Sequence, residues 1–162
     1  MTITELAKDV ATKAHEGQFY GTGDPYIMHP TQTAHLAKRL GYGDAVQAAC
    51  YLHDVLEDTA VTEAELRDQF PKEVVDAVVA VTYVGKDYSQ KIKQAMTHPI
   101  GHVVKFCDAS CNFANGVLHG VKPGQTEFEV IPRRAGYLAA LLHSLPTPKE
   151  IDEDILISKH PA

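Results

Sequence analysis

The amino-acid sequence predicts an all-α protein that folds as one compact bundle of helices. Apolar residues recur three and four positions apart through nearly the whole chain, which is the spacing of one face of an α-helix. No segment alternates apolar and polar residues as a half-buried strand would. The length of 162 residues and the hydrophobic share of 44% suit a single domain with its own core.

The first helix is expected over Ile3–Ala14, where the apolar residues keep helical spacing. Thr2 and Glu5 form a capping-box pattern, in which each side chain bonds a free backbone N–H at the start of the helix. A polar, glycine-rich loop is expected next, over residues 18–26.

Proline and glycine mark the second helix. Pro30 fits the first turn of a helix, because the N–H that proline lacks has no partner there. Gly41 or Gly43 can end that helix. A third helix is expected over residues 44–56, with its alanines, leucines and valine on the buried side.

The middle of the chain contains two further start signals. Thr62 and Glu65 repeat the capping-box pattern before a short helix that ends near Phe70. Pro71 then begins a helix in which the valines of residues 74–79 recur at helical spacing, although they are β-branched.

The second half of the chain is expected to contain three helices and a long loop. A helix over residues 88–96 is followed by one that Pro99 begins. Residues 116–131 are expected to form a loop, and residues 135–142 lie in a final firm helix. We expect the domain to comprise residues 1–145, and residues 146–162 to form an acidic tail that is weakly helical or frayed.

Composition excludes several classes of function. The net charge of −6 and the lack of a basic block argue against nucleic-acid binding through a charged surface. We expect no signal peptide and no membrane span. Three cysteines without a CxxC pair argue against a disulfide framework or a structural zinc site, and favour the reducing cytoplasm. Nine histidines in an acidic chain of this length point to a metal site.

One cluster of polar residues interrupts an apolar helix. His53 and Asp54 are adjacent, and Glu57 and Asp58 follow each of them by four residues, so the pairs share helix faces. The flanking leucines and valine predict burial, and buried charges are costly unless they are paired or bind a metal. Mixed nitrogen and oxygen donors suit Mn²⁺, Fe²⁺ or Zn²⁺. The alternative is an exposed acidic helix end beside a hydrogen-bonded core histidine.

Two further residues are placed to complete a metal site. His29 precedes Pro30 at a helix start, and Asp108 lies in an apolar helix, one turn before Asn112. Alternatively, His29 caps its helix and Asp108 forms an ion pair with Lys105. The four candidate ligands are His29, His53, Asp54 and Asp108.

Four segments together carry a family resemblance. They read AHEGQ at 14–18, GDPYIMHP at 23–30, HDVLEDT at 53–59 and VKFCDASCN at 104–112. In this order the chain resembles the HD-domain metal-dependent phosphohydrolases over roughly residues 5–145. Within that family it resembles the alarmone hydrolases, which comprise the hydrolase half of the Rel/Spo stringent-response enzymes and the small alarmone hydrolases.

The resemblance implies an activity and a set of roles. The family removes the 3′-pyrophosphate from (p)ppGpp, giving GDP or GTP and pyrophosphate, with one Mn²⁺ held by residues that match the four candidate ligands. Glu57 and Asp58 match the acidic pair that orients or deprotonates the attacking water. Asn112 matches a residue that contacts the sugar region of the nucleotide. His15 matches a residue that we interpret as structural. The expected partner is therefore a small phosphorylated nucleotide, with no nucleic acid and no membrane.

The sequence departs from the family where phosphate is recognised. Many alarmone hydrolases carry a basic pair just after the AHxGQ segment, where this chain has Phe19 and Tyr20. Arg133 and Tyr137 are four residues apart and resemble a pair that contacts phosphate and sugar in the small hydrolases. The candidate cations that remain are Lys91, Lys93, Lys105, Arg133 and Arg134, and Lys86 lies in the same segment as Lys91 and Lys93.

Two alternatives follow from these departures. The first is an HD phosphohydrolase that acts on another nucleotide, such as an adenosine alarmone or a nucleoside monophosphate. The second is a nucleotide-binding regulator without turnover, against which the intact Glu57 and Asp58 argue.

Overall fold

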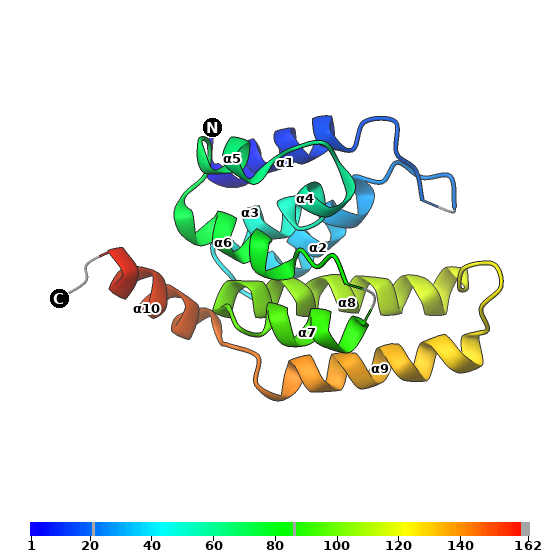
Figure 1. Ribbon diagram of the computed structural model, residues 1–162. Coiled ribbons are helices and arrows are strands. Elements are labelled where there is room, and N and C mark those ends of the chain that lie inside the picture. The colour runs from blue at the N-terminus through cyan, green and yellow to red at the C-terminus, as the bar shows by residue number, and fades with distance from the viewer. Residues whose placement is uncertain (21, 86, 160–162) are drawn as a thin grey trace.

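The computed structural model describes residues 1–20, 22–85 and 87–159, which form α-helices joined by loops (Figure 1). Within these ranges there are ten helices and no β-strand, and one isolated backbone bridge pairs Phe19 with Pro25. The predicted all-α class is therefore confirmed.

Each helix whose start was predicted from a proline or a capping box begins within two residues of that signal. Their bounds are α1 (Ile3–Ala14), α2 (Met28–Arg39), α3 (Asp44–Leu52), α4 (Val55–Asp58), α5 (Glu63–Arg67), α6 (Lys72–Val81), α7 (Tyr88–Ala95), α8 (Pro99–His119), α9 (Glu127–His143) and α10 (Pro148–Lys159). None of these described helices has the length and apolar character that a membrane crossing requires.

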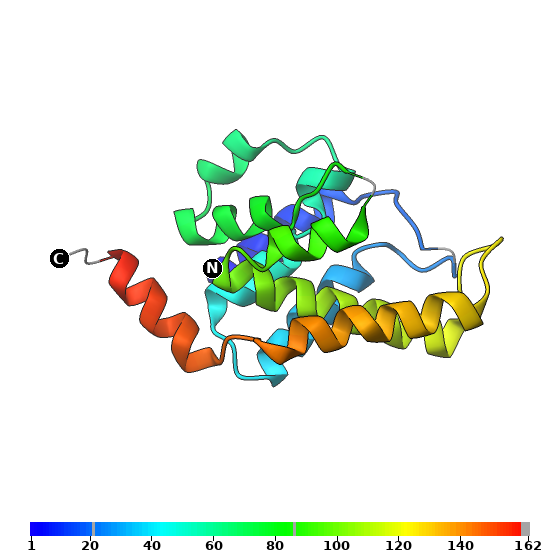
Figure 2. The same ribbon diagram turned by 60° about the horizontal axis from the view of Figure 1, so that its bottom comes forward.

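Helix α3 lies at the centre of the bundle. It packs against α1, α2, α6 and α8 (Figures 1 and 2). Ala48, Ala49 and Leu52 are completely buried on it. The small alanines let neighbouring helices approach closely, and valines of α6 and α8 fill the remaining space. The carboxyl end of α3 is therefore held firmly at the point where the polar cluster begins.

Both predicted capping boxes are present. The N–H of Glu5 donates to Thr2 Oγ1 at 3.2 Å, and the N–H of Thr2 donates to Glu5 Oε2 at 2.6 Å. Thr62 and Glu65 repeat this pair of bonds at the start of α5. Such a cap contributes about 1 kcal/mol to helix stability.

The helix expected over residues 44–56 is interrupted. Helix α3 ends at Leu52, and the short helix α4 begins at Val55, so His53 and Asp54 lie in the break. The four polar residues therefore do not lie on one continuous helix as expected. Both residues keep right-handed helical φ and ψ values across the break, and Nε2 of His53 lies 3.0 Å from Oδ2 of Asp54.

The loop expected over residues 116–131 is much shorter. Helix α8 continues to His119, and α9 begins at Glu127. Gly120 has a φ of +84°, a conformation that favours glycine and ends α8. The two helices run side by side as a hairpin (Figures 1 and 2). Their mutual packing accounts for helical turns within residues 116–131, where the sequence predicted a loop.

The described part of the tail is helical. It forms helix α10, whose Ile151 is 1% exposed and packs within the main core. Thr147 and Glu150 form a third capping box, which the sequence analysis missed. The domain boundary after residue 145 stays a prediction.

Candidate metal centre and active site

His53 is fixed by the backbone of α3. Its Nδ1 lies 2.7 Å from the carbonyl oxygen of Cys50, which can only accept a hydrogen bond. Nδ1 therefore carries the proton, and in the neutral ring Nε2 keeps a free lone pair. The ring is 3% exposed, and its Nε2 points into the polar cluster.

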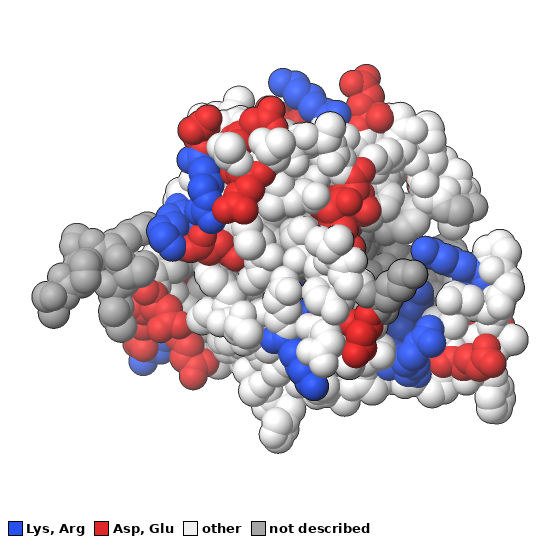
Figure 3. All heavy atoms as spheres, viewed as in Figure 1, with Lys and Arg blue, Asp and Glu red and all other residues white. Residues whose placement is uncertain are grey.

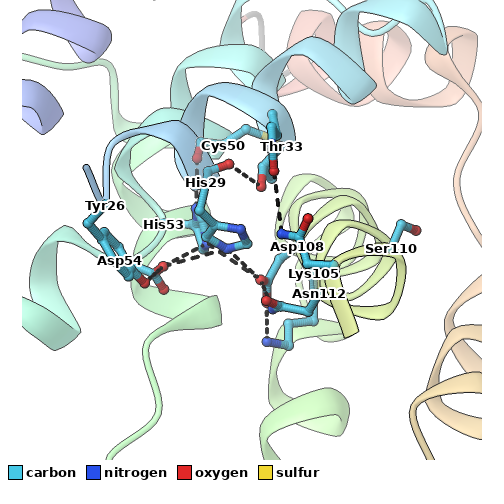
Figure 4. Close-up of polar contacts among 12 residues, drawn as sticks. Tyr26, His29, Thr33, Cys50, His53, Asp54, Lys105, Asp108, Ser110 and Asn112 are labelled. Atoms are coloured by element: carbon cyan, nitrogen blue, oxygen red, sulfur yellow. Dashed lines mark hydrogen bonds and ion pairs between the residues drawn. The ribbon is translucent and has the colours of Figure 1, made fainter. Parts of the chain in front are cut away.

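Three other side chains meet His53 there (Figure 4). His29 comes from the first turn of α2, and its Nε2 lies 3.2 Å from Nε2 of His53. Asp108 comes from α8, and its Oδ1 lies 3.0 Å from Nε2 of His29. Oδ2 of Asp54 lies 3.0 Å from Nε2 of His53 and 3.9 Å from that of His29. The fold therefore brings all four candidate ligands together.

The cluster fits a divalent cation. Donor atoms of His29, His53 and Asp108 all lie within 4.8 Å of one another, and all three side chains are buried. Burial alone would lower the pKa of His53, but the carboxylates of Asp54 and Asp108 outweigh burial and raise that pKa to about 10. The site therefore attracts positive charge, and imidazole with carboxylate is a donor set for Mn²⁺, Fe²⁺ or Zn²⁺.

Both carboxylates are oriented by outer hydrogen bonds. Lys105 Nζ donates to Oδ2 of Asp108 at 2.5 Å, and Asn112 Nδ2 donates to Oδ1 at 2.6 Å. Burial opposes ionisation of Asp108, but the charge of Lys105 and a hydrogen bond from His29 hold its pKa well below the usual range. The sequence analysis considered an ion pair of Lys105 with Asp108 as an alternative to metal binding. In the structure this ion pair forms beside the four candidate ligands, so the two interpretations are compatible.

Tyr26 orients the other carboxylate, and the sequence analysis gave it no role. Its hydroxyl donates to Oδ2 of Asp54 at 2.6 Å. Its ring packs on His15, which is 3% exposed and bonds Gln18 through Nδ1. The available signal was the position of Tyr26 in the segment that also holds His29.

Tyr26→Phe is expected to weaken Mn²⁺ binding by about 10- to 100-fold while the fold is kept, because outer-shell hydrogen bonds orient metal ligands. Titration of the metal-stripped protein with Mn²⁺ measures this. Tyr42→Phe is the matched control, since it also loses one hydroxyl bond, to the carbonyl of Pro146 rather than to a candidate ligand. Equal Mn²⁺ affinity in both variants would contradict the role of Tyr26.

The acidic pair of α4 lies beside the cluster. Glu57 accepts two bonds from Lys91 Nζ, at 2.7 and 2.9 Å, and one from the N–H of Tyr83 at 3.3 Å. The carboxylate of Asp58 lies 3.5 Å from the hydroxyl of Tyr26. Burial, and then the charges of Asp54 and Glu57, raise the pKa of Asp58.

The cluster opens into a cavity of about 820 Å³. Its lining includes all the residues predicted to bind substrate, which are Lys91, Lys105, Asn112, Arg133 and Tyr137. Lys122 and Arg134 line it as well. Lys and Arg side chains gather on the right of the face shown in Figure 3, at the end of the molecule where α8 meets α9. A cavity with an acidic floor and basic walls can accept a phosphorylated ligand.

One candidate cation among the described residues, Lys93, is not part of this lining. Lys93 lies two residues from Lys91 on α7, which places it on another helix face, and it is exposed. Lys86 lies outside the described residues.

Comparisons with known proteins agree with this geometry. A family model described as HD domain matches residues 7–101, which is more than half of the chain. A guanosine-3′,5′-bis(diphosphate) 3′-pyrophosphohydrolase of Haemophilus influenzae is 40% identical over 77 residues, covering 48% of this chain and 11% of that protein. A GTP pyrophosphokinase of Myxococcus xanthus is 36% identical over 100 residues, covering 59% of this chain and 13% of that protein. The chain thus spans only a small part of these relatives.

One solved structure matches nearly the whole chain. It is described as a metazoan ortholog of SpoT that hydrolyzes ppGpp. The TM-score is 0.75 with 17% sequence identity, and the match covers 99% of this chain and 97% of the other. At this identity the likeness shows a shared fold.

Proposed function

Because the chain belongs to the HD-domain family, we propose that it is a metal-dependent phosphohydrolase that removes the 3′-pyrophosphate from (p)ppGpp-like alarmones, giving GDP or GTP and pyrophosphate. The observation that carries this proposal is the cluster of two histidines and two aspartates at the floor of a cavity whose walls hold five lysines and arginines. Curated relatives with this activity in their names match about half of the chain.

We propose that the cofactor is one Mn²⁺ and that His29, His53, Asp54 and Asp108 hold it. A divalent cation there would polarise a phosphoryl oxygen and lower the pKa of a water beside it. Two carboxylates among the ligands favour a metal that accepts oxygen as readily as nitrogen, which suits Mn²⁺. The hydrogen bonds from Tyr26 and Asn112 hold these carboxylates in place.

We propose that Glu57 and Asp58 orient the attacking water or accept the proton that it loses. In the reaction, the oxygen of water bonds to phosphorus while the bond from that phosphorus to the ribose 3′ oxygen breaks. Water gives up a proton, and the ribose oxygen takes one. The raised pKa of Asp58 makes it a better proton acceptor than an exposed aspartate, and Glu57 lies beside it at the cavity.

The walls of the cavity are proposed to bind the phosphates and the sugar. Lys91, Lys105 and Arg133 supply positive charge, and the first two are already paired with carboxylates of the site. Asn112 and Tyr137 are proposed to contact the sugar region, since both line the cavity near these cations. A small nucleotide is the ligand that this combination fits.

A second candidate substrate is favoured by one observation. Phe19 and Tyr20 line the cavity where many alarmone hydrolases carry a basic pair. Fewer cations favour a nucleotide with fewer phosphates, such as a nucleoside monophosphate, or an adenosine alarmone. The regulator without turnover is less favoured, because Glu57 and Asp58 both face the cavity. Location in the cytoplasm, inferred from the cysteines, stays a prediction.

Product analysis across a nucleotide panel tests the substrate. The Mn²⁺-loaded protein is incubated with ppGpp, pppGpp, the adenosine counterpart of ppGpp, and GMP, and the products are separated by anion exchange. The proposal predicts GDP from ppGpp and GTP from pppGpp, each with an equal amount of pyrophosphate. Faster release of phosphate from GMP, or preference for the adenosine compound, would establish the second candidate instead.

A further inference from the structure

The cavity has two walls of different chemistry. One wall carries the basic side chains of α7, α8 and α9 and of the loop between α8 and α9. The other includes Phe19, in the loop before α2. The ring of Phe19 is 64% exposed, and it has no ring contact among the described residues. Because five other side chains of the lining are lysines and arginines, the exposed ring of Phe19 offers a ligand a contact of a different kind.

Hydrogen bonds hold the described residues on either side of Phe19. The N–H of Tyr26 donates to the carbonyl of Gln18 at 2.9 Å, and the N–H of Tyr20 donates to that of Asp24 at 2.8 Å. Gln18 also donates through Nε2 to the carbonyl of Asp58 at 2.9 Å, which ties the loop to α4. The ring of Phe19 is therefore attached to an ordered backbone, so a ligand would not have to order it.

The neighbouring aromatic rings already have partners. Tyr20 stacks on Tyr26 with 5.1 Å between ring centroids, and its ring meets His29 at 5.7 Å in an edge contact. Tyr26 also packs on His15, at 4.8 Å. These rings support the metal ligands, and Phe19 is the aromatic residue of this loop whose face remains available.

We propose that Phe19 is a stacking platform for the base of the bound nucleotide, while the basic wall holds its phosphates. This inference rests on the proposed nucleotide ligand but not on the proposed reaction. A ring on which a base stacks accepts purines alike, because every base has a π-face and stacking reads no hydrogen-bond pattern. We therefore expect GDP and ADP to bind with similar affinity, and the phosphates to decide which ligands bind.

A tryptophan reporter tests the platform directly, since the chain contains no tryptophan. Phe19→Trp places the only indole at the proposed platform. Stacking of a base should quench its fluorescence saturably when GDP or ADP is added, whereas pyrophosphate should leave the emission unchanged. Phe128→Trp is the matched control, because Phe128 is 94% exposed on α9 and does not line the cavity. Equal quenching in both variants, or quenching by pyrophosphate alone, would overturn the proposal.

Substitution at the same position gives a second test. Calorimetry with GDP should show about 5- to 100-fold weaker binding for Phe19→Ala, the range that corresponds to the loss of one base–aromatic stack. Phe19→Tyr should bind GDP as the unmodified protein does, and Phe19→Leu should not recover the loss, because leucine restores bulk without a π-face. Unchanged binding by Phe19→Ala, or full recovery by Phe19→Leu, would overturn the proposal. Since GDP is a product, failure to hydrolyse ppGpp would refute the proposed reaction and leave this result standing.

Discussion

His53→Ala is expected to abolish Mn²⁺ binding and hydrolysis together, with a loss of activity of at least about a thousandfold. Nε2 of His53 lies 3.0 to 3.7 Å from donor atoms of the other three candidate ligands. Its removal would leave Asp54 without its nearest nitrogen partner and would open a gap at the floor of the cavity. Metal content after dialysis and turnover of ppGpp are the two measurements.

A buried histidine elsewhere separates this effect from loss of packing. His102 is 4% exposed, and its Nε2 bonds the carbonyl of Leu141 at 2.7 Å, so His102→Ala also removes a buried, hydrogen-bonded ring. It should lower the thermal midpoint but keep Mn²⁺. His53→Gln, which preserves more of the side-chain volume, should still lose the metal. Activity at the unmodified level in folded His53→Ala protein would refute the site assignment.

Glu57→Ala is expected to keep the metal and to slow turnover by about 10²- to 10⁴-fold, the usual contribution of a positioned acid or base. The donor atoms of the metal cluster belong to other residues, so Mn²⁺ affinity should not change. Lys91, which bonds both oxygens of Glu57, would lose its partner and be free to contact phosphate, so KM should not rise. Single-turnover rates and Mn²⁺ titration measure the two effects separately.

Glu63→Ala is the control for this prediction, because Glu63 is an exposed glutamate that pairs with Arg67 and does not line the cavity. Its turnover should be unchanged. Loss of Mn²⁺ from Glu57→Ala would place Glu57 among the ligands. Unchanged turnover in Glu57→Ala would favour Asp58 alone as the proton acceptor. A biological effect that survives Glu57→Ala unchanged would favour the regulator without turnover.

The sequence predicted the starts of helices well where they depend only on residues a few positions apart. The capping boxes at Thr2 and Thr62 depend on residues three positions apart, so the sequence contains all the information that they need. Thr147 and Glu150 follow the same pattern and could have been found in the same way. The extent of α9 depends instead on its contact with α8, which no local pattern contains.

The break between α3 and α4 shows the same limit at the site. His53 and Asp54 lie among apolar residues of good helical spacing, so the sequence predicts an unbroken helix. The turn arises where His53 bonds the carbonyl of Cys50 and meets His29 from another helix. Residue type could therefore indicate the four candidate ligands, while their convergence required the fold.

Support for the ligands was the part of the site that sequence reasoning missed. Tyr26 is separated by 28 positions from Asp54, which its hydroxyl contacts. Lys105 and Asn112 were predicted to face substrate, and both line the cavity, but each also bonds Asp108. The sequence analysis considered the ion pair of Lys105 with Asp108 only as an alternative to metal binding, whereas in the structure it accompanies the cluster.

The central claim is tested most directly by pyrophosphate release from ppGpp by the metal-stripped protein, before and after Mn²⁺ is added. The account predicts no release without metal, and equal amounts of GDP and pyrophosphate once Mn²⁺ is bound. Release that does not depend on added metal would contradict the proposed centre. No release from protein shown to hold Mn²⁺ would contradict the proposed substrate and leave the metal centre intact.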